Sequence, residues 1–255
     1  MFNSLYERSI GRMNLEPSPT LNRRHRAVAT AGEVRPDRKA AILLAAEKLF
    51  AQFGYHAVTI RQIAETAGVP LALVAYYYGQ KHELFQTIFA HWNDTIEERL
   101  QELRAAQDQP DDAQTLARII EAFVGPVLRM RASPEGEYYA LLIARELSYN
   151  TEVTDRVLRT YFDPLANAFI AALKRTLAHA TRGQIAWCYQ FALGALLHHL
   201  SDTRVHRLSR GQSLPGDPTA HALLVNFITG GIRAALPVAQ TASSTASSKS
   251  NRRKS

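Results

Sequence analysis

The chain has 255 residues, of which 46% are hydrophobic, enough to bury one large core or two smaller ones. Its net charge of +7 comes from the ends: residues 1–39 and 240–255 together carry +8, so the middle of the chain sums to −1. The charge therefore indicates two basic arms and not a basic folded body. One cysteine excludes an internal disulfide framework, and no stretch approaches the ~20 apolar residues of a membrane-spanning helix. We expect a soluble cytoplasmic protein that does not enter the membrane.

The hydrophobic spacing along the chain predicts an all-α fold between two terminal arms. Residues 1–34 have no sustained hydrophobic period and are interpreted as a disordered basic arm, as are residues 237–255 at the other end. From Arg38, the run RKAAILLAAEKLFAQFGY spaces its apolar residues by three and four and ends at Gly54, which predicts an amphipathic helix. Further helices are predicted at 81–106, 112–131, 135–148, 150–178, 182–206 and 217–235.

Two short helices are predicted within residues 59–78. Thr59 and Gln62 form a capping box that starts the first helix, and Gly68 ends it in a conformation that glycine adopts readily. Val74 and Tyr78 supply the inward face of the second helix. This spacing is typical of a helix-turn-helix, whose second helix lies in the major groove of DNA.

A longer ordered set of residues makes this motif more specific. The run from Arg38 to about Phe89, which includes ILLAAEKLFAQFGYHAVTIRQIAETAGVP and YYYGQKHELF, resembles the DNA-binding domain of the tetracycline-repressor (TetR) family. The resemblance implies about nine helices, a DNA-binding domain at 35–95, and a C-terminal ligand-binding and dimerisation domain at 96–236. It also implies operator DNA and a small hydrophobic effector as partners. We expect no cofactor and no metal.

The resemblance implies roles on DNA for individual residues of this chain. Arg61 matches a residue that reaches a base edge, although it also fits a solvated surface arginine. Tyr76 and Tyr77 match contacts to phosphate or sugar, with packing against the first helix as the alternative for Tyr77, and Lys81 matches a phosphate-binding lysine. For Tyr78 the core interpretation is preferred. The DNA-binding set is completed by Thr59, Leu71, Ala72, Leu73 and Ala75.

Three positions depart from the family pattern and bear on operator reading. Pro70 and Gln80 replace the usual capping residues before two helices, and Ala75 replaces a larger side chain that often reads a base. The second helix then offers no Arg, Asn, Gln or Lys to the bases. We therefore expect apolar contacts with thymine methyl groups, with one guanine contact from Arg61.

The C-terminal part offers a weaker set of candidates for an effector site. Its similarity to the fatty-acid-responsive subgroup is loose and covers no ligand-specific motif. Arg145 beside Glu146 could hold an anionic ligand, and a structural ion pair is the alternative. Ordinary core packing is the alternative for the apolar and aromatic candidates. These are Trp92, Phe123, Met130, Tyr139, Phe169, Trp187 and Phe191.

The last two long helices carry the assembly prediction. The stretch IAWCYQFALGALLHHL is apolar on nearly all sides, so residues 182–206 and 217–235 are expected to join two copies in a homodimer. His198, His199, Asp202 and His206 have helical spacing but no further ligand nearby, which favours an interface position over a metal site.

Three classes of function compete. A transcriptional repressor released from its operator by a small hydrophobic ligand is preferred. An enzyme is disfavoured, because the sequence has no Gly-rich phosphate loop, no nucleophile elbow and no strong metal-ligand spacing. A DNA-bound adaptor of the same fold, controlled by a protein partner, remains open, and a tightly packed C-terminal core would favour it.

Overall fold

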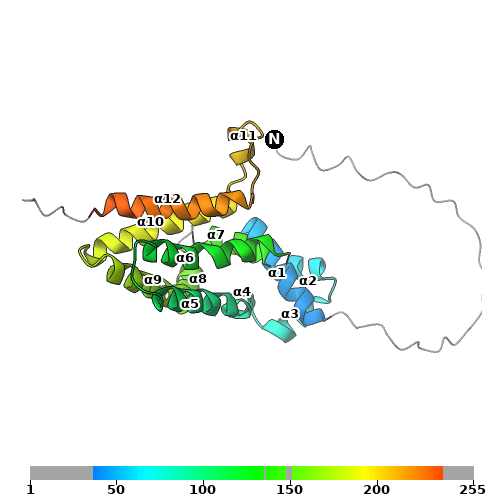
Figure 1. Cartoon of the computed structure of the whole chain (residues 1–255). Helices are drawn as coiled ribbons and strands as arrows, with labels where there is room; N and C mark the ends of the chain where they lie inside the picture. Colours follow the sequence, from blue (N-terminus) through cyan, green and yellow to red (C-terminus); the bar gives the residue numbers. More distant parts are fainter. Residues whose placement is uncertain (1–36, 135, 148–150, 238–255) are drawn as a thin grey trace, which may run out of the picture. The chain divides into compact units, whose positions relative to one another are not determined.

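The structure is a computed structural model that describes residues 37–134, 136–147 and 151–237. The predictions of disordered basic arms at 1–34 and 237–255 lie outside these residues, apart from Pro237 itself. Across the described ranges the fold is all-α, as predicted, with no strand (Figure 1). None of the helices in these ranges combines the length and apolarity needed to cross a membrane.

Twelve α-helices and one π-helical stretch make up the described part of the chain. They are α1 (Arg38–Phe53), α2 (Ile60–Ala67), α3 (Leu71–Tyr78), α4 (Lys81–His91), α5 (Asn93–Gln107), α6 (Thr115–Ala132), α7 (Glu137–Glu146), α8 (Glu152–Val157), η1 (Leu158–Phe162), α9 (Asp163–Thr176), α10 (Arg182–Ser201), α11 (Val205–Leu208) and α12 (Thr219–Ala235). Only Trp92 separates α4 from α5, α8 continues through η1 into α9, and α11 has four residues, so the described segments agree with the expectation of about nine helices.

The first three helices start and stop where the sequence predicts. The Asp37 carboxylate accepts hydrogen bonds from the backbone N–H groups of Lys39 and Ala40 and so caps α1. Thr59 and its capping box start α2, and Gly68 ends α2 at a φ of 65°. Pro70 offers α3 no side-chain cap, as expected for the departure at this position.

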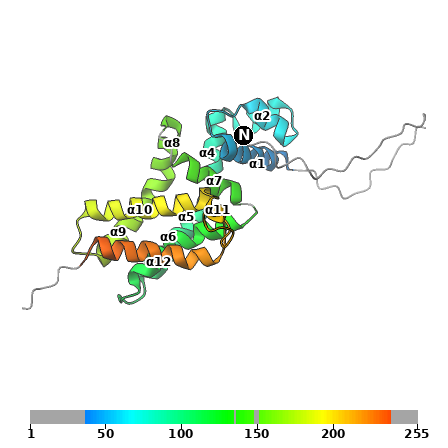
Figure 2. The ribbon, with the colours of Figure 1, turned by 90° about the horizontal axis from the view of Figure 1, so that it is seen from above.

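The predicted helix at 182–206 is too long. The α10 helix ends at Ser201 because Asp202 has an extended backbone, and its carboxylate accepts a hydrogen bond from the backbone N–H of Arg204. The chain then makes the short helix α11 before α12. Helices α10 and α12 lie side by side (Figures 1 and 2).

Helix α7 packs against α1 at one side and against α6 and α10 at another. It therefore belongs to the core of the C-terminal helices and also touches the first helix of the DNA-binding domain. Buried side chains from both parts form one continuous hydrophobic core, which runs from Ile42 in α1 to Leu236 after α12. This arrangement places α7 in contact with both regions that the sequence links to DNA and to a ligand.

Candidate functional site

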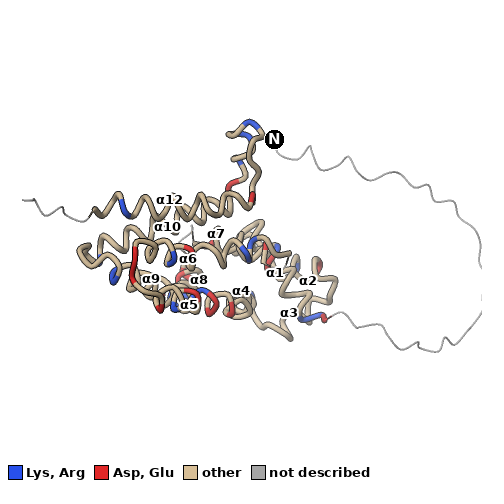
Figure 3. Tube along the Cα trace, in the orientation of Figure 1, with Lys and Arg blue, Asp and Glu red and all other residues tan. Residues whose placement is uncertain are grey.

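The exposed face of α3 is apolar and uncharged (Figure 3). Leu71, Ala72, Ala75 and Tyr76 are exposed, with Tyr76 at 79%. Val74 and Tyr78 are buried, which confirms the predicted inward stripe. Leu73, the remaining residue of the predicted reading face, is half-buried against the core, because the turn of the helix directs it partly inward. It is the least accessible residue of that face.

The three consecutive tyrosines have two different environments. The rings of Tyr76 and Tyr77 lie edge to face on the surface, with their centroids 5.2 Å apart. The hydroxyl of Tyr78 donates a hydrogen bond of 2.7 Å to the carbonyl oxygen of Lys39, and burial together with the charge of Asp37 raises the pKa of Tyr78 to about 12. Tyr78 thus links α3 to the start of α1, whereas the side chains of Tyr76 and Tyr77 remain exposed.

Two cations of the predicted DNA-binding set flank this surface. Arg61 is exposed on α2 and forms an ion pair with Glu65 one turn later, at 3.0 Å. The ammonium of Lys81, at the start of α4, lies 4.4 Å from the centre of the Tyr55 ring, and burial lowers the pKa of Lys81. Thr59 is exposed, but its hydroxyl is engaged in capping α2. Arg61 and Lys81 therefore place positive charge on both sides of the exposed face of α3.

Two further basic residues lie near α3 although the sequence pattern does not single them out. Arg38 and Lys39 begin α1 and are exposed, and the Lys39 ammonium lies 6.0 Å from the centre of the Tyr78 ring. Their position depends on the bond between Tyr78 and the Lys39 carbonyl, a tertiary contact between residues 39 apart in the sequence. No local sequence signal reports such a contact.

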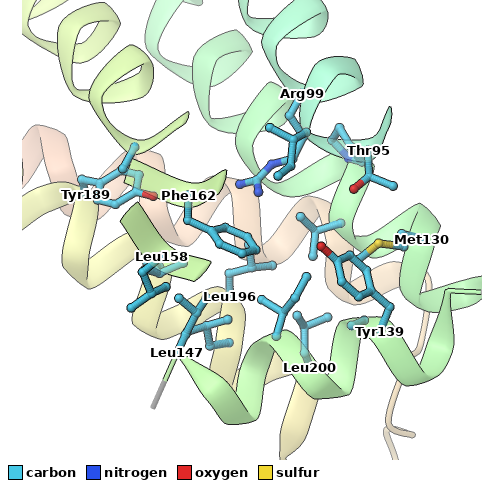
Figure 4. A pocket seen from close by; sticks show the side chains of 18 of the residues that line it. Thr95, Arg99, Met130, Tyr139, Leu147, Leu158, Phe162, Tyr189, Leu196 and Leu200 are labelled. Atoms are coloured by element: carbon cyan, nitrogen blue, oxygen red, sulfur yellow. The ribbon is translucent and has the colours of Figure 1, made fainter. Parts of the chain in front are cut away.

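A cavity of about 200 Å³ opens within the C-terminal helices (Figure 4). Its walls come from α5, α6, α7, η1, α9 and α10, and most lining side chains are aliphatic or aromatic. Leu158 and Phe162 reach it from the π-helical stretch, a distortion that recurs at functional sites because it redirects side chains. The core of this domain is therefore not packed shut.

Two of the eight predicted ligand residues, Met130 and Tyr139, line the cavity. Phe123 and Phe169 are also buried, but their rings pack against each other at 5.2 Å and do not line it. Trp92 lies outside the cavity and stacks on Tyr139, with the ring centres 5.1 Å apart.

The other three predicted ligand residues lie elsewhere. Arg145 points to the end of α1, where it donates hydrogen bonds to the carbonyl oxygens of Gln52 and Phe53 at 3.3 and 3.2 Å. Trp187 and Phe191 are 63% and 68% exposed on α10 and do not line this cavity. Aromatic content alone does not tell whether a side chain faces this cavity, another part of the core or the surface.

The neighbouring carboxyl of Glu146 accepts a hydrogen bond of 2.8 Å from the hydroxyl of Thr154. The Nε2 atom of His198 lies 3.1 Å from the carboxylate of Asp202 at the end of α10. Among the described residues, no group of three or more His, Cys, Asp or Glu side chains is arranged to hold a metal ion.

Arg99 is the cavity residue that the sequence pattern does not indicate. It lies on α5 between positions that read as a polar helix surface, yet it is only 8% exposed. Its guanidinium lies 5.2 Å from the Phe123 ring centre and donates a hydrogen bond of 3.3 Å to the Phe123 carbonyl oxygen. Burial lowers the pKa of Arg99. A charge inside an apolar cavity is costly, so Arg99 is the most informative residue of the site.

Two family models match the chain. Residues 42–88 match the bacterial regulatory proteins of the tetR family, and residues 121–231 match a tetracyclin repressor-like C-terminal domain. The transcriptional repressor BepR of Brucella suis is 32% identical over 179 residues, which cover 68% of this chain and 79% of BepR.

Other relatives match over shorter segments. The transcriptional regulator RutR of Escherichia coli is 41% identical over 66 residues, or 26% of this chain and 28% of RutR. The transcriptional activator FasR of Mycolicibacterium smegmatis is 29% identical over 89 residues, or 35% of this chain and 40% of FasR. The chain therefore spans less than half the length of these relatives.

Solved structures share the fold. A TetR-family regulator from Bordetella parapertussis has a TM-score of 0.56 at 14% identity and covers 76% of this chain and 95% of its own. The fatty acid degradation regulator FadR from Bacillus halodurans has a TM-score of 0.52 at 17% identity and covers 79% and 99%. At such identities the likeness extends to the fold alone.

Proposed function

The chain belongs to the TetR family of DNA-binding transcriptional regulators, and we propose that it is a cytoplasmic repressor released from its operator by a small hydrophobic ligand. We propose that it binds operator DNA as a dimer through the helix-turn-helix at residues 59–78, which lies within the matched family model. The proposed addition is ligand control through the cavity. The observation that carries it is that one helix, α7, both lines the cavity and contacts α1.

The contacts of α7 make this coupling concrete. Tyr139 on α7 lines the cavity and stacks on Trp92, whose indole N–H donates a hydrogen bond of 2.9 Å to the carboxyl of Glu47 in α1. Two turns further along α7, Arg145 holds the carbonyl oxygens at the end of α1. A ligand that displaces α7 would therefore move α1 and with it α3, because the Tyr78–Lys39 bond joins these two helices.

Native mass spectrometry and operator binding together test ligand control. A short operator is first selected from random duplex DNA with the purified dimer. The protein is then depleted of bound small molecules by unfolding, extraction and refolding, and its operator affinity is compared before and after by fluorescence anisotropy at fixed salt. We expect extra mass in the native dimer and operator binding at least about fivefold tighter after depletion, the lower end of usual allosteric coupling.

A matched variant locates the coupling. Arg145→Met removes the contact with α1 but leaves every cavity-lining residue in place. We expect this variant to bind the same small molecule and to show a smaller change in operator affinity. If neither depletion nor this substitution changes operator binding, ligand control through α7 is wrong.

The adaptor alternative, control by a protein partner, predicts a packed C-terminal core. The cavity of about 200 Å³ favours a small molecule. An adaptor would show no bound mass and an operator affinity that changes only when a protein partner is added.

We also propose how the operator is read. The uncharged face of α3 supports methyl contacts with thymine from Leu71, Ala72 and Ala75, and the exposed Arg61 supports one guanine contact per half-site. Single thymine-to-uracil replacements in a mapped half-site remove only methyl groups, so at least one should weaken binding, measured at fixed salt. If none does and Arg61→Ala keeps the sequence preference, DNA shape is the selecting feature.

A further inference from the structure

Resting on the proposed ligand control, we infer that the cavity takes a small amphiphilic anion whose charged group pairs with Arg99. The inference begins from the state of the Arg99 side chain. A guanidinium has five N–H donors, and the structure gives that of Arg99 one hydrogen bond, to the Phe123 carbonyl. Its buried Nε has no hydrogen-bond partner among the described residues.

No carboxylate in the described part of the chain forms an ion pair with Arg99. Asp163 is the one acidic residue among the described residues that line the cavity, and it is exposed at the start of α9. The Phe123 and Phe169 rings, at 5.2 and 5.8 Å from the guanidinium carbon, provide cation–π contacts. These are worth less than a paired anion in a buried place, so the charge of Arg99 is left without a counter-charge.

A second buried polar group belongs to the same cavity. The hydroxyl of Tyr139 is fully buried and has no hydrogen-bond partner in the described residues. In Figure 4 the guanidinium of Arg99 and the hydroxyl of Tyr139 both point into the cavity from opposite walls, α5 and α7. Two unsatisfied donors that face one space are the arrangement that a carboxylate, with its two acceptor oxygens, would satisfy.

The rest of the cavity suits an apolar chain. Apart from Arg99, Tyr139 and the hydroxyl of Thr95, the labelled walls are mostly apolar, including Leu147, Leu158 and Leu196 (Figure 4). A volume of about 200 Å³ lies below the ~300–1,000 Å³ of drug-sized sites, so a short chain fits best. The combination of a buried cation with aliphatic walls selects a short amphiphile with a negative end.

Octanoate and octanamide test this inference, because they share chain length and differ in charge. Isothermal titration calorimetry with the full chain at pH 7 should show octanoate binding about 10- to 100-fold more tightly than octanamide, the worth of a hydrogen-bonded charged group. Arg99→Met should abolish that preference. Arg104→Gln, an exposed arginine on the same helix, should keep it.

Two more variants guard against a folding artefact. Tyr139→Phe deletes only the unsatisfied hydroxyl and should weaken octanoate binding more than octanamide binding, because a hydrogen bond to a charged acceptor is the stronger one. Arg99→Lys keeps the charge and should retain part of the preference. Circular dichroism and light scattering confirm that each variant is folded as the native chain is.

Each outcome decides the inference. Equal binding of octanoate and octanamide, or an octanoate preference that survives Arg99→Met, overturns it. If octanamide binds equally well and releases the operator, ligand control stands and only the anionic preference falls. If neither probe binds, the inference also falls, and ligand control is then decided by the depletion experiment.

Discussion

Gly79 joins α3 to α4 in a backbone conformation that other residues adopt only with strain. Its φ is 69°, and a Cβ there would lie 2.1 Å from Oε2 of Glu83. Glu83 could swing away, but that carboxylate accepts a hydrogen bond of 2.6 Å from the backbone N–H of Gln80 and starts α4. We therefore expect Gly79→Ala to lower the free energy of unfolding by about 1–3 kcal/mol, measured by urea denaturation. Gly183→Ala, in the first turn of α10 with open space around it, should leave stability unchanged or slightly higher.

Lys81 is predicted to contact a DNA phosphate, and the salt dependence of binding can isolate that role. A phosphate contact carries no sequence information, so Lys81→Ala should weaken binding about equally on operator and random DNA and reduce the salt slope by ~1. Lys174→Ala, a lysine near the end of α9, should change neither quantity. A loss confined to operator DNA would instead assign Lys81 to base reading. Fluorescence anisotropy at several salt concentrations gives both values.

At the residue scale, what could be predicted depended on whether the determining contact is local. The capping box of Thr59 and the left-handed conformation of Gly68 are determined within one short helix, and the structure confirms both. The burial of Arg99 depends on α6 and α9, which supply the Phe123 and Phe169 rings. A pattern of hydrophobic spacing on one helix carries no information about such partners, so the most telling cavity residue was not predictable.

The contact between α1 and α7 has a titratable group at its centre. Glu47 is buried, and this burial raises its pKa from 4.5 to about 7, although the bond from Trp92, a backbone N–H of Tyr139 and the charge of Lys48 each oppose the shift. Between about pH 4.5 and pH 7 the folded chain holds a proton that the unfolded chain has released. Stability should therefore fall as the pH rises through this window, by about 1–3 kcal/mol.

Glu47→Gln tests this pH dependence. Glutamine does not ionise and still offers an oxygen to the Trp92 indole N–H, so the fall in stability across the window should be largely lost. Glu97→Gln, at an exposed position on α5, should leave the native pH dependence in place. Urea denaturation at intervals from pH 4.5 to pH 7.5 measures both. A native chain equally stable at the two ends would mean that Glu47 is not perturbed.

At the scale of elements, helices were predictable and their interruptions were not. Periodicity places α1, α6 and α12 to within a few residues, because each carries apolar side chains at three- and four-residue spacing. The π-helical stretch at Leu158–Phe162 and the end of α10 at Ser201 depend on packing and on the Asp202 backbone. Hydrophobic spacing alone did not separate these regions from the neighbouring helices, so sequence patterning predicted longer helices than the chain forms.

Helices α10 and α12 share an exposed apolar surface that one copy of the chain leaves uncovered. Trp187, Phe191, Leu223 and Phe227 are between 63% and 70% exposed on it. This is the pattern of a surface closed by a second copy, and it agrees with the predicted homodimer. Two of these residues were expected in a ligand site instead, because hydrophobicity indicates burial without telling which partner provides it.

Charged substitutions on the apolar surface of α10 and α12 test the predicted homodimer. The double variant Phe191→Glu and Phe227→Glu should be monomeric by light scattering at micromolar concentration, since two carboxylates per copy cannot be buried unpaired. It should also lose most of its operator affinity, because a monomer contacts one half-site. Phe53→Glu, at an exposed aromatic residue on α1, should remain dimeric. A native chain that is itself monomeric would refute this assembly.

The uncharged face of α3 has a consequence for how chemical marks on DNA would affect this regulator. A cytosine methylated at C5 places a methyl group in the major groove at the position where thymine carries its own. A helix that contacts methyl groups through Leu71, Ala72 and Ala75 would bind such a cytosine as it binds a thymine. We expect methylation of a half-site cytosine next to a contacted thymine to change affinity at fixed salt, whereas methylation outside the half-site leaves it unchanged. The operator would then report the methylation state of the genome as well as its base sequence.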